Sequence, residues 1–474
     1  MSEIVLALDQ GGQSSRAIAF DRHGRQIASA SESVPTTHPG PGRYEQDPEA
    51  LVQSVRASLS RVLPSLAAGT TVRAGIATQR SSVVCWDRVT GRALSPVLSW
   101  RDRRNADWLR SLDLDEARVH RLTGLRPSPH YGAAKLRWCL DHLPAVTSAL
   151  DQGRLAWGPL ASFLVFRITR ERTLATDPVN ASRTLLMDIG SGDWSEDLLA
   201  DFGLPAEAMP PIVSGERGFG TLDVDTVPLP LALSTGDQAA ALYAQGAPDP
   251  ALAFVNAGTG AFALRSASWP NPEARLLTSV VGGSDAGLEF ALEGTVNGAA
   301  SALEAEALRL GVVDWITSID TAPSDGASIP VFLNGYSGLG SPWWRESFRS
   351  RYEGEGPAGA RLTAVLESIT FMLHVNLAAI RDRLGPPVGI RVGGGLSRLD
   401  GFCQRLADLS GAPVHRPVQI EATARGLAWL VGGREPDWPM PGGERFRPRP
   451  NPGLDSRFRR WHACMEQALS DDTV

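Results

Sequence analysis

The sequence predicts an α/β protein of two domains, chiefly because a strand-loop-strand segment occurs twice. Residues 4–10 are apolar enough for a buried strand, residues 11–15 form a loop of glycine, glutamine and serine, and residues 16–20 form a returning strand. The same plan recurs at residues 252–264, around Ala257-Gly258-Thr259-Gly260. Each half therefore opens with a hairpin whose tip carries glycines and hydroxyl groups.

A hairpin tip of this composition can bind phosphate. Glycines let the backbone approach an anion closely, and exposed N–H and hydroxyl groups donate hydrogen bonds to its oxygens. Two such tips that face each other predict a clamp on a nucleotide.

The length supports two domains, because 474 residues exceed the roughly 250–300 residues at which a single core stops growing. The boundary is expected near Gly246, which gives domains of residues 1–246 and 247–474. Hydrophobic residues make up 43 % of the chain and charged residues 21 %, which is typical of a soluble globular protein.

Charge and targeting signals exclude several classes of function. The net charge of −6 is modest, and no basic region indicates a nucleic-acid partner. The sequence shows neither a secretory signal nor a membrane span, and its four cysteines lack the spacing of a zinc site or a disulfide framework. We therefore expect a cytoplasmic protein, in which Lys135 is the only lysine.

The first half continues from the hairpin with a strand at residues 25–28 and a helix that begins at Asp47-Pro48-Glu49. An aspartate cap followed by proline is a start signal, and apolar residues follow at helical spacing. The strand at residues 74–77 then delivers residues 78–81 to its carboxyl end, where ligands bind in open α/β sheets. Helical patterns follow up to Leu109 and at residues 133–143.

The second half repeats this plan after its own hairpin. Helices are expected around residues 299–310 and 362–384 and from Asp400, and a strand leads into Gly393-Gly394-Gly395. The apolar stripe of Leu366, Ile369, Leu373 and Leu377 predicts that the long helix is a core helix.

Taken in order, these segments resemble the FGGY carbohydrate kinase family over nearly the whole chain, and the motif sequences are most similar to those of its glycerol kinases. A single glycine cluster would be a weak signal, but eight or more motifs in the family's order are a strong one. The matching motifs are at residues 8–17, 42–48, 79–87, 100–104, 131–138, 236–240, 258–260, 292–294, 338–344 and 393–395.

The resemblance implies a duplicated actin-like, ribonuclease-H-like ATPase fold with a nucleotide cleft between its two domains. It also implies that the chain transfers the γ-phosphoryl group of ATP to a hydroxyl of a small sugar or polyol, with Mg²⁺ as cofactor.

Asp237 is the candidate catalytic residue. By position alone it is equally well explained as a cap on the free N–H groups of the Ala-rich helix that follows Gly236. The resemblance implies the role of general base, because phosphoryl transfer needs a positioned carboxylate to accept the acceptor hydroxyl's proton. Gln238 would then help to hold the acceptor.

Asp9 is the candidate metal residue. An aspartate before Gly-Gly is often bonded to its own turn, whereas the resemblance implies that Asp9 serves Mg²⁺ through water. The resemblance further implies nucleotide contacts from both hairpins and from a glycine under the adenosine, namely Gly11, Gly12, Gln13, Ser14, Arg16, Thr259, Gly260 and Gly395.

The chain departs from the glycerol kinases around both substrates. Gly12 and Gln13 stand where threonines are usual, and Leu399 stands where an asparagine near the purine is usual. In the acceptor pocket, Ser81 replaces a glutamate and His130 a tyrosine. Loss of the carboxylate removes a charge-assisted hydrogen bond and leaves room, so we expect an acceptor larger than glycerol in a pocket lined by Arg80, Trp100 and His130.

Two alternatives remain open from the sequence. The first is a glycerol kinase with an altered pocket. The second, motivated by the departures, is a catalytically silent sensor of nucleotide or sugar, although the retained Asp9, Asp237 and Thr259 argue against it. A homodimer is expected by family analogy alone.

Overall fold

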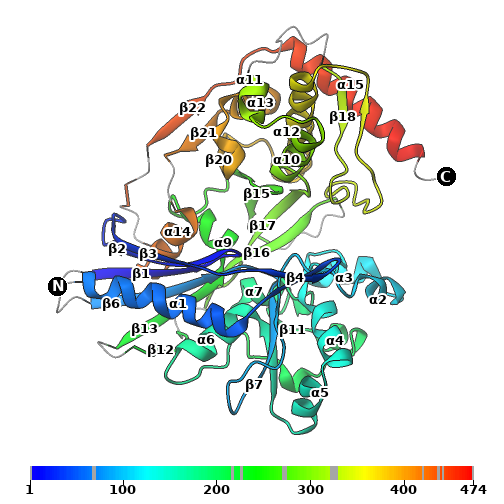
Figure 1. The fold of residues 1–474 in the computed structure, drawn as a ribbon. Helices are drawn as coiled ribbons and strands as arrows, with labels where there is room; N and C mark the ends of the chain where they lie inside the picture. The colour runs from blue at the N-terminus through cyan, green and yellow to red at the C-terminus, as the bar shows by residue number, and fades with distance from the viewer. Residues whose placement is uncertain are drawn as a thin grey trace.

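The computed structural model describes the chain at residues 3–66, 71–214, 218–224, 228–269, 275–320, 329–418, 421–434, 438–439 and 442–471. Two large sheets dominate it, one in each half of the molecule (Figure 1). The first has the order β12 (Thr221–Leu222), β13 (Leu229–Gly236), β6 (Thr71–Thr78), β1 (Glu3–Gln10), β2 (Ser14–Asp21) and β3 (Gln26–Ser33). The second has the order β16 (Leu277–Ser284), β17 (Gly287–Val296), β15 (Ala261–Ala267), β14 (Leu252–Ala257), β20 (Gly389–Gly393), β21 (Val414–Pro417) and β22 (Gly443–Phe446).

The two sheets share one plan, which confirms the duplication expected from the hairpins. In the first sheet β1, β2 and β3 are antiparallel neighbours, while β6 runs parallel to β1 and β13 parallel to β6. In the second sheet β14, β15 and β17 are antiparallel neighbours, while β20 runs parallel to β14 and β21 parallel to β20. This is the expected actin-like, ribonuclease-H-like arrangement.

A smaller sheet and several helices are inserted in the first half. The small sheet has the order β4 (Thr37–Gly40), β5 (Arg43–Gln46), β8 (Val97–Leu98), β7 (Val83–Asp87) and β9 (Leu155–Pro159). The helices around it include α2 (Ala106–Ser111), α3 (Glu116–Thr123), α4 (Gly132–His142), α5 (Pro144–Asp151), α6 (Leu160–Ile168), α7 (Pro178–Ser182) and α8 (Glu196–Asp201).

Helix α1 (Pro48–Val62) covers β2 and β3 of the first sheet, and its start confirms the capping signal. The side chain of Asp47 accepts a hydrogen bond from the backbone N–H of Glu49 at 2.9 Å. Leu51, Val55 and Leu59 are buried, as their helical spacing predicts.

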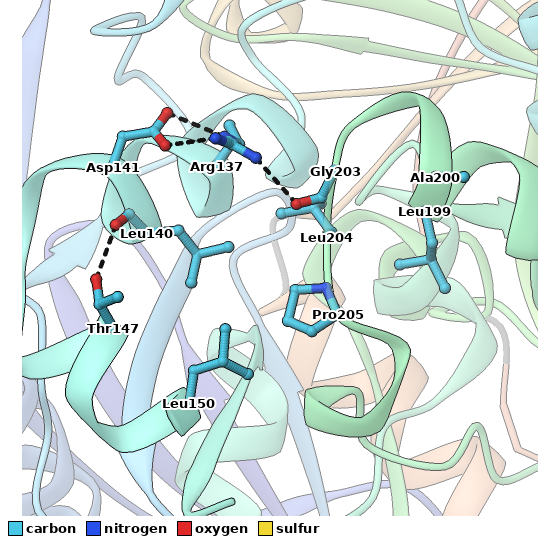
Figure 2. A pocket seen from close by; sticks show the side chains of 10 residues that line it. All are labelled: Arg137, Leu140, Asp141, Thr147, Leu150, Leu199, Ala200, Gly203, Leu204 and Pro205. Atoms are coloured by element: carbon cyan, nitrogen blue, oxygen red, sulfur yellow. Dashed lines mark hydrogen bonds and ion pairs between the residues drawn. The ribbon is translucent and has the colours of Figure 1, made fainter. Parts of the chain in front are cut away.

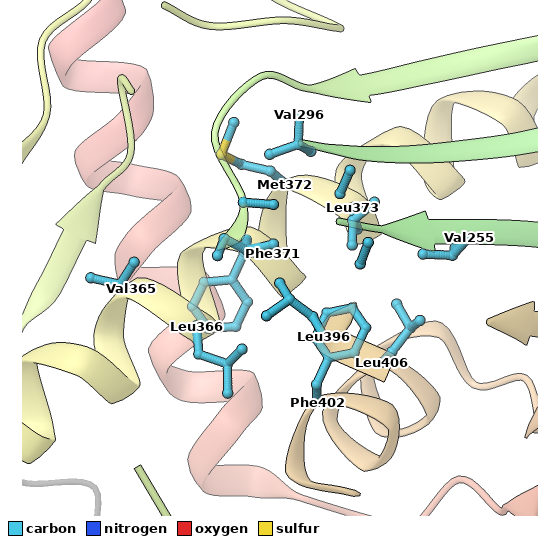
Figure 3. Packing of buried hydrophobic residues seen from close by; sticks show 14 of the residues in the cluster. Val255, Val296, Val365, Leu366, Phe371, Met372, Leu373, Leu396, Phe402 and Leu406 are labelled. Carbon is cyan, nitrogen blue, oxygen red and sulfur yellow. The ribbon is translucent and has the colours of Figure 1, made fainter. Parts of the chain in front are cut away.

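Helix α12 (Ala358–Leu384) is the centre of the second core. Its buried side chains pack on β15 and β17 and against α13 (Asp400–Ser410), as Figure 3 shows for Leu366, Phe371 and Phe402. By length and composition α12 could cross a membrane, but 83 % of its most apolar window is buried inside the fold. It is therefore the core helix that the apolar stripe predicted. Helices α10 (Ala300–Arg309), α11 (Trp315–Asp320) and α15 (Pro452–Asp471) complete this half.

Helix α14 (Ala422–Val431) lies between β21 and β22 of the second sheet in sequence but packs on β1, β6 and α9 (Asp237–Leu242) of the first half (Figure 1). Two glycines permit this close contact. A Cβ atom at Gly426 would lie 1.8 Å from the carbonyl oxygen of Ala240, and one at Gly75 would lie 2.6 Å from a methyl carbon of Val431. Backbone contact between α14 and α9 therefore fixes the helix that begins at Asp237.

Substitution of Gly426 tests this contact. In Gly426→Ala the new methyl group meets backbone rather than a movable side chain, so we expect a loss of about 1–3 kcal/mol in unfolding free energy together with lower turnover. Gly401→Ala in α13 is the control, because its Cβ would meet only the end of the Arg405 side chain and helical alanine is favoured over glycine by up to about 1 kcal/mol. Urea unfolding measures both variants, and equal stability would contradict the close packing.

Candidate active site

Three parallel strands of the first sheet end side by side, and their ends supply the predicted catalytic and acceptor residues. In register, Gln10 of β1 lies opposite Thr78 of β6, and Thr78 lies opposite Gly236 of β13. The segments that follow these three residues are the first hairpin tip, the turn from Gln79 to Ser82, and Asp237 with Gln238. They therefore meet at the carboxyl edge of one sheet, where ligands bind in open α/β folds.

Asp237 is the first residue of α9, with Gly236 as the cap residue. One of its carboxylate oxygens accepts a hydrogen bond from the backbone N–H of Gln238 at 2.7 Å. Burial raises the pKa of Asp237, and the positive charges of Arg80 and Arg183 oppose this rise. A raised pKa makes the Asp237 carboxylate a stronger base, which suits it to accept a proton.

Asp9 lies near the end of β1, close enough for the charge of Asp237 to act on it. Burial first, and then the Asp237 charge, raise the pKa of Asp9 to about 7, although Arg16 acts in the opposite direction. Arg16 is paired with Asp9 in the register of β1 and β2, and its guanidinium forms an ion pair with Glu421. Two carboxylates in one desolvated region leave negative charge that a cation would balance.

The residues around Asp9 fit Mg²⁺. This ion typically binds one or two carboxylates and keeps several waters and phosphate oxygens as its other ligands. Within the described part of the chain, no group of three or more His, Cys, Asp or Glu residues could hold a metal by itself. A metal here would therefore depend on the nucleotide phosphates and on water as well as on Asp9.

The charge on Asp9 is expected to destabilise the metal-free protein at high pH. Its folded pKa of about 7 lies above the usual aspartate value of 3.8, so the stability associated with its neutral form is lost as pH rises from about 4 to about 7. In metal-free buffer, Asp9→Asn should therefore have a higher melting temperature than the wild type, and the difference should be larger at pH 8 than at pH 5. Thermal melts at both pH values measure this, and a gap that does not grow with pH would contradict the assignment.

Arg80 and Gln238 form one side of the acceptor region. The Arg80 guanidinium donates a hydrogen bond to the side-chain oxygen of Gln238, and a Cβ atom at Gly236 would lie 2.7 Å from the Arg80 side chain. Burial lowers the pKa of Arg80 to about 10, which leaves it charged at neutral pH. Arg80 is thus a fixed cation beside Asp237.

Ser81 has a backbone conformation that serine rarely adopts, with φ of 62°. Its side chain is buried, and its hydroxyl oxygen has no hydrogen-bond partner among the residues that the structure describes. Strained non-glycine residues with unpaired buried polar groups are often found at ligand sites. The Ser81 hydroxyl is therefore a candidate contact for the acceptor.

Trp100 and His130, the other predicted acceptor residues, lie next to each other. Trp100 is 37 % exposed, and its ring meets that of His130 edge-on with centroids 6.0 Å apart. A Cβ atom at Gly12 would lie 3.7 Å from the indole nitrogen, so the first hairpin tip adjoins Trp100. Burial, followed by the nearby charge of Lys135, lowers the pKa of His130 well below its usual value, and its imidazole is therefore neutral.

The structure adds charged residues that the sequence did not single out as a site. The Arg183 guanidinium donates to the Glu293 carboxylate and to the Ser279 hydroxyl, each at 2.7 Å. Arg183 follows α7 in the first half, whereas Glu293 lies in β17 of the second, so this buried ion pair joins the halves beside Asp237. Glu293 stood within a family motif, but nothing in the sequence marked Arg183.

A chain of buried amides links the first hairpin tip to the turn that carries Arg80. Gln46 donates to the carbonyl of Gly12 at 3.0 Å and accepts from Gln79 at 2.8 Å. The hydroxyl of Ser82 in turn donates to Gln79 at 2.9 Å. The hairpin and the acceptor turn are thus held together.

Both predicted phosphate hairpins have tight tips. The N–H of Gly11 donates to the carbonyl of Ser14, and that of Gly258 to the carbonyl of Gly260, each at 2.9 Å. Thr259 lies in the second tip, where its carbonyl accepts hydrogen bonds from Ala299 and Ser301.

In the second sheet, the glycine run at residues 393–395, the third predicted nucleotide segment, lies beside the tip of the second hairpin. In register, Asn256 of β14 lies opposite Gly393 of β20, so the turn at Thr259 adjoins the glycine run. A Cβ atom at Gly395 would meet nothing within 4 Å, which leaves open space for a ligand. Leu399 is only 8 % exposed and packs in the second core, so its side chain is part of the core.

A pocket of about 490 Å³ lies elsewhere, lined by residues of α4, α5 and α8 and of the segment after α8. Figure 2 shows an ion pair in its lining, between Arg137 and Asp141 at 2.6 Å. None of the predicted catalytic, acceptor or nucleotide residues lines this pocket.

Comparison with known proteins supports the resemblance along the whole chain. Residues 4–242 match the N-terminal domain of the FGGY family of carbohydrate kinases, and residues 253–432 match its C-terminal domain. A protein of Xanthobacter autotrophicus named glycerol kinase is 34 % identical over 500 residues, with all of both chains covered. Another of that name, from Alkalilimnicola ehrlichii, is 38 % identical over 453 residues and covers 90 % of each chain.

Solved structures of similar fold include several sugar kinases. Plasmodium falciparum glycerol kinase with ADP superposes with a TM-score of 0.89 at 24 % identity and covers 99 % of this chain and 98 % of its own. A gluconate kinase from Lactobacillus acidophilus gives 0.86 at 18 % identity, with 99 % of both chains covered. A xylulose kinase from Rhodospirillum rubrum gives 0.86 at 22 %, with 98 % of both covered.

Proposed function

This chain belongs to the FGGY family of carbohydrate kinases, and we propose that it uses Mg-ATP to phosphorylate a polyol or ketose larger than glycerol, with Asp237 as general base. It is an ATP-dependent sugar or polyol kinase. The base, its metal partner and the acceptor region are our assignments, as is a cytoplasmic location. These assignments rest on the position of the Asp237 carboxylate. Its negative charge helps to raise the pKa of Asp9, and the positive charge of Arg80 acts to lower the pKa of Asp237 itself.

Phosphoryl transfer needs a hydroxyl oriented for attack and a group to take its proton. In our assignment Arg80 and Gln238 hold the acceptor hydroxyl against the Asp237 carboxylate. As the oxygen–phosphorus bond forms, the hydroxyl proton passes to Asp237 and ADP leaves. Asp237 then releases the proton to solvent when the phosphorylated product departs.

The nucleotide is assigned to the two hairpins. Backbone N–H groups of the first tip at Gly12 and Gln13 and of the second tip at Thr259 and Gly260 would contact its phosphates, with Ser14 adding a hydroxyl. Gly11, whose N–H donates to Ser14 within the tip, would let the backbone approach the phosphates closely. Mg²⁺ held by Asp9 through water would neutralise phosphate charge. Arg16 contributes through its ion pair with Glu421, which places its charge opposite Asp9.

The size of the acceptor is inferred from Ser81. Ser81, whose hydroxyl has no partner among the described residues, stands where glycerol kinases usually have a glutamate, and the shorter side chain would leave room for a further hydroxymethyl group. The exposed face of Trp100 suits the C–H side of a sugar, and neutral His130 can donate or accept a hydrogen bond. Glycerol is the second candidate, favoured by the two relatives named glycerol kinase at 34 % and 38 % identity.

Asp237→Asn tests the base. The amide cannot take the hydroxyl proton, so turnover should fall by at least about two orders of magnitude, the usual contribution of general base catalysis. Binding of ATP, followed by calorimetry, should persist. Asp107→Asn, an isosteric change on the exposed side of α2, is the control, and near-normal turnover in Asp237→Asn would rule out the base assignment.

Ser81→Glu tests the acceptor size. The added carboxylate can make a charge-assisted hydrogen bond to glycerol, worth about 1.5–3 kcal/mol, and it occupies the extra space. The kcat/KM ratio for glycerol over the best of erythritol, xylitol, D-xylulose and D-ribulose should rise roughly 10- to 100-fold. ADP release measures the ratio, and a wild type that already prefers glycerol would support the second candidate instead.

A further inference from the structure

Lys135, the only lysine of the chain, is buried behind the acceptor region. It lies in the first turns of α4 and is 1 % exposed. Its ammonium donates to three backbone carbonyls, those of Ser81 at 2.9 Å, Ser99 at 2.8 Å and His130 at 2.8 Å. No other lysine amine is available to replace it.

The three carbonyls come from three separate segments, and each segment carries one residue of the acceptor region. Ser81 follows β6 and Ser99 immediately precedes Trp100, while His130 is in the loop before α4. One buried nitrogen therefore joins the segments that present the Ser81 hydroxyl, the Trp100 ring and the His130 ring. Ser81 also keeps its left-handed backbone, with φ of 62°, while its carbonyl is held in this way.

The number of donors matches the charged form of Lys135. An ammonium group has three N–H donors, one for each carbonyl, whereas a neutral amine has two and would turn a lone pair toward the third. Burial lowers the pKa of Lys135 to about 7; the charge of Asp102 opposes this shift and the charges of Arg103 and Arg104 add to it, so the ammonium is the dominant form below pH 7. Around His130, the positive charges of Lys135, Arg103, Arg183 and Arg80 all favour a neutral imidazole.

We propose that Lys135 is a positioning residue for the acceptor: by holding the carbonyls of Ser81, Ser99 and His130 it fixes the side chains that receive the sugar or polyol. This inference rests on the proposed kinase function. It assigns the lysine no contact with substrate and no role in proton transfer.

Two substitutions separate geometry from charge. Lys135→Met keeps the length of the side chain and removes all three donors, while Lys135→Arg keeps the charge in a planar group that cannot direct three donors from one atom. With D-xylulose and glycerol as acceptor probes, both variants should raise the acceptor KM at least tenfold and leave the ATP KM within twofold.

Leu136→Ala is the matched control, because Leu136 is also buried in α4, at 2 % exposure, but packs in an apolar core. It should lower the melting temperature without changing the acceptor KM. An acceptor KM that stays within twofold of the wild type in Lys135→Met, or one that rises equally in Leu136→Ala, would overturn the proposal.

A second measurement needs no acceptor. NMR titration of the imidazole, assigned with His130→Asn, should give a higher pKa for His130 in Lys135→Met than in the wild type. An unchanged His130 pKa would overturn the proposal. If neither probe is phosphorylated, the proposed function fails for these acceptors, while the His130 titration still decides the role of Lys135.

Discussion

The active site depends on one electrostatic constraint, the placement of the Asp9 and Asp237 carboxylates in the same desolvated region. Burial and then repulsion from Asp237 raise the pKa of Asp9 to about 7, and burial also raises the pKa of Asp237. Nearby cations partly balance this negative charge. The charges of Arg80 and Arg183 act on Asp237, and Arg16 lies opposite Asp9 in the register of β1 and β2. Mg²⁺ with a nucleotide would complete the balance of charge, which is why a kinase can keep two acidic groups so close.

The fold creates this constraint through strand register and through packing between the halves. Register brings the ends of β1, β6 and β13 to one edge, and α14, packed on the first sheet through Gly75 and Gly426, fixes the helix that begins at Asp237. The Arg183–Glu293 ion pair joins the halves beside the same carboxylate. Catalytic geometry and contact between the halves are therefore set by the same elements.

Much of this could be predicted from the sequence, because hairpins, caps and apolar spacing are local signals. The two glycine-tipped hairpins, the Asp47 cap and the core stripe of α12 all have a physical cause within a few residues. Three features could not be predicted, because each joins segments far apart in sequence. They are the packing of α14 across the halves, the Arg183–Glu293 ion pair and the hydrogen bonds by which Lys135 joins three backbone segments. The domain boundary near Gly246 and the homodimer stay predictions.

The most direct test of the shared carboxylate region is the proton balance of nucleotide binding. Calorimetric titration of preformed Mg-ADP at pH 6.5, in buffers of different ionisation enthalpy, counts the protons exchanged on binding. The wild type should release more protons than Asp9→Asn, because the cation forces the Asp9 carboxylate to ionise. Equal proton release by the two proteins would show that Asp9 does not meet the cation, and it would contradict this account of the site.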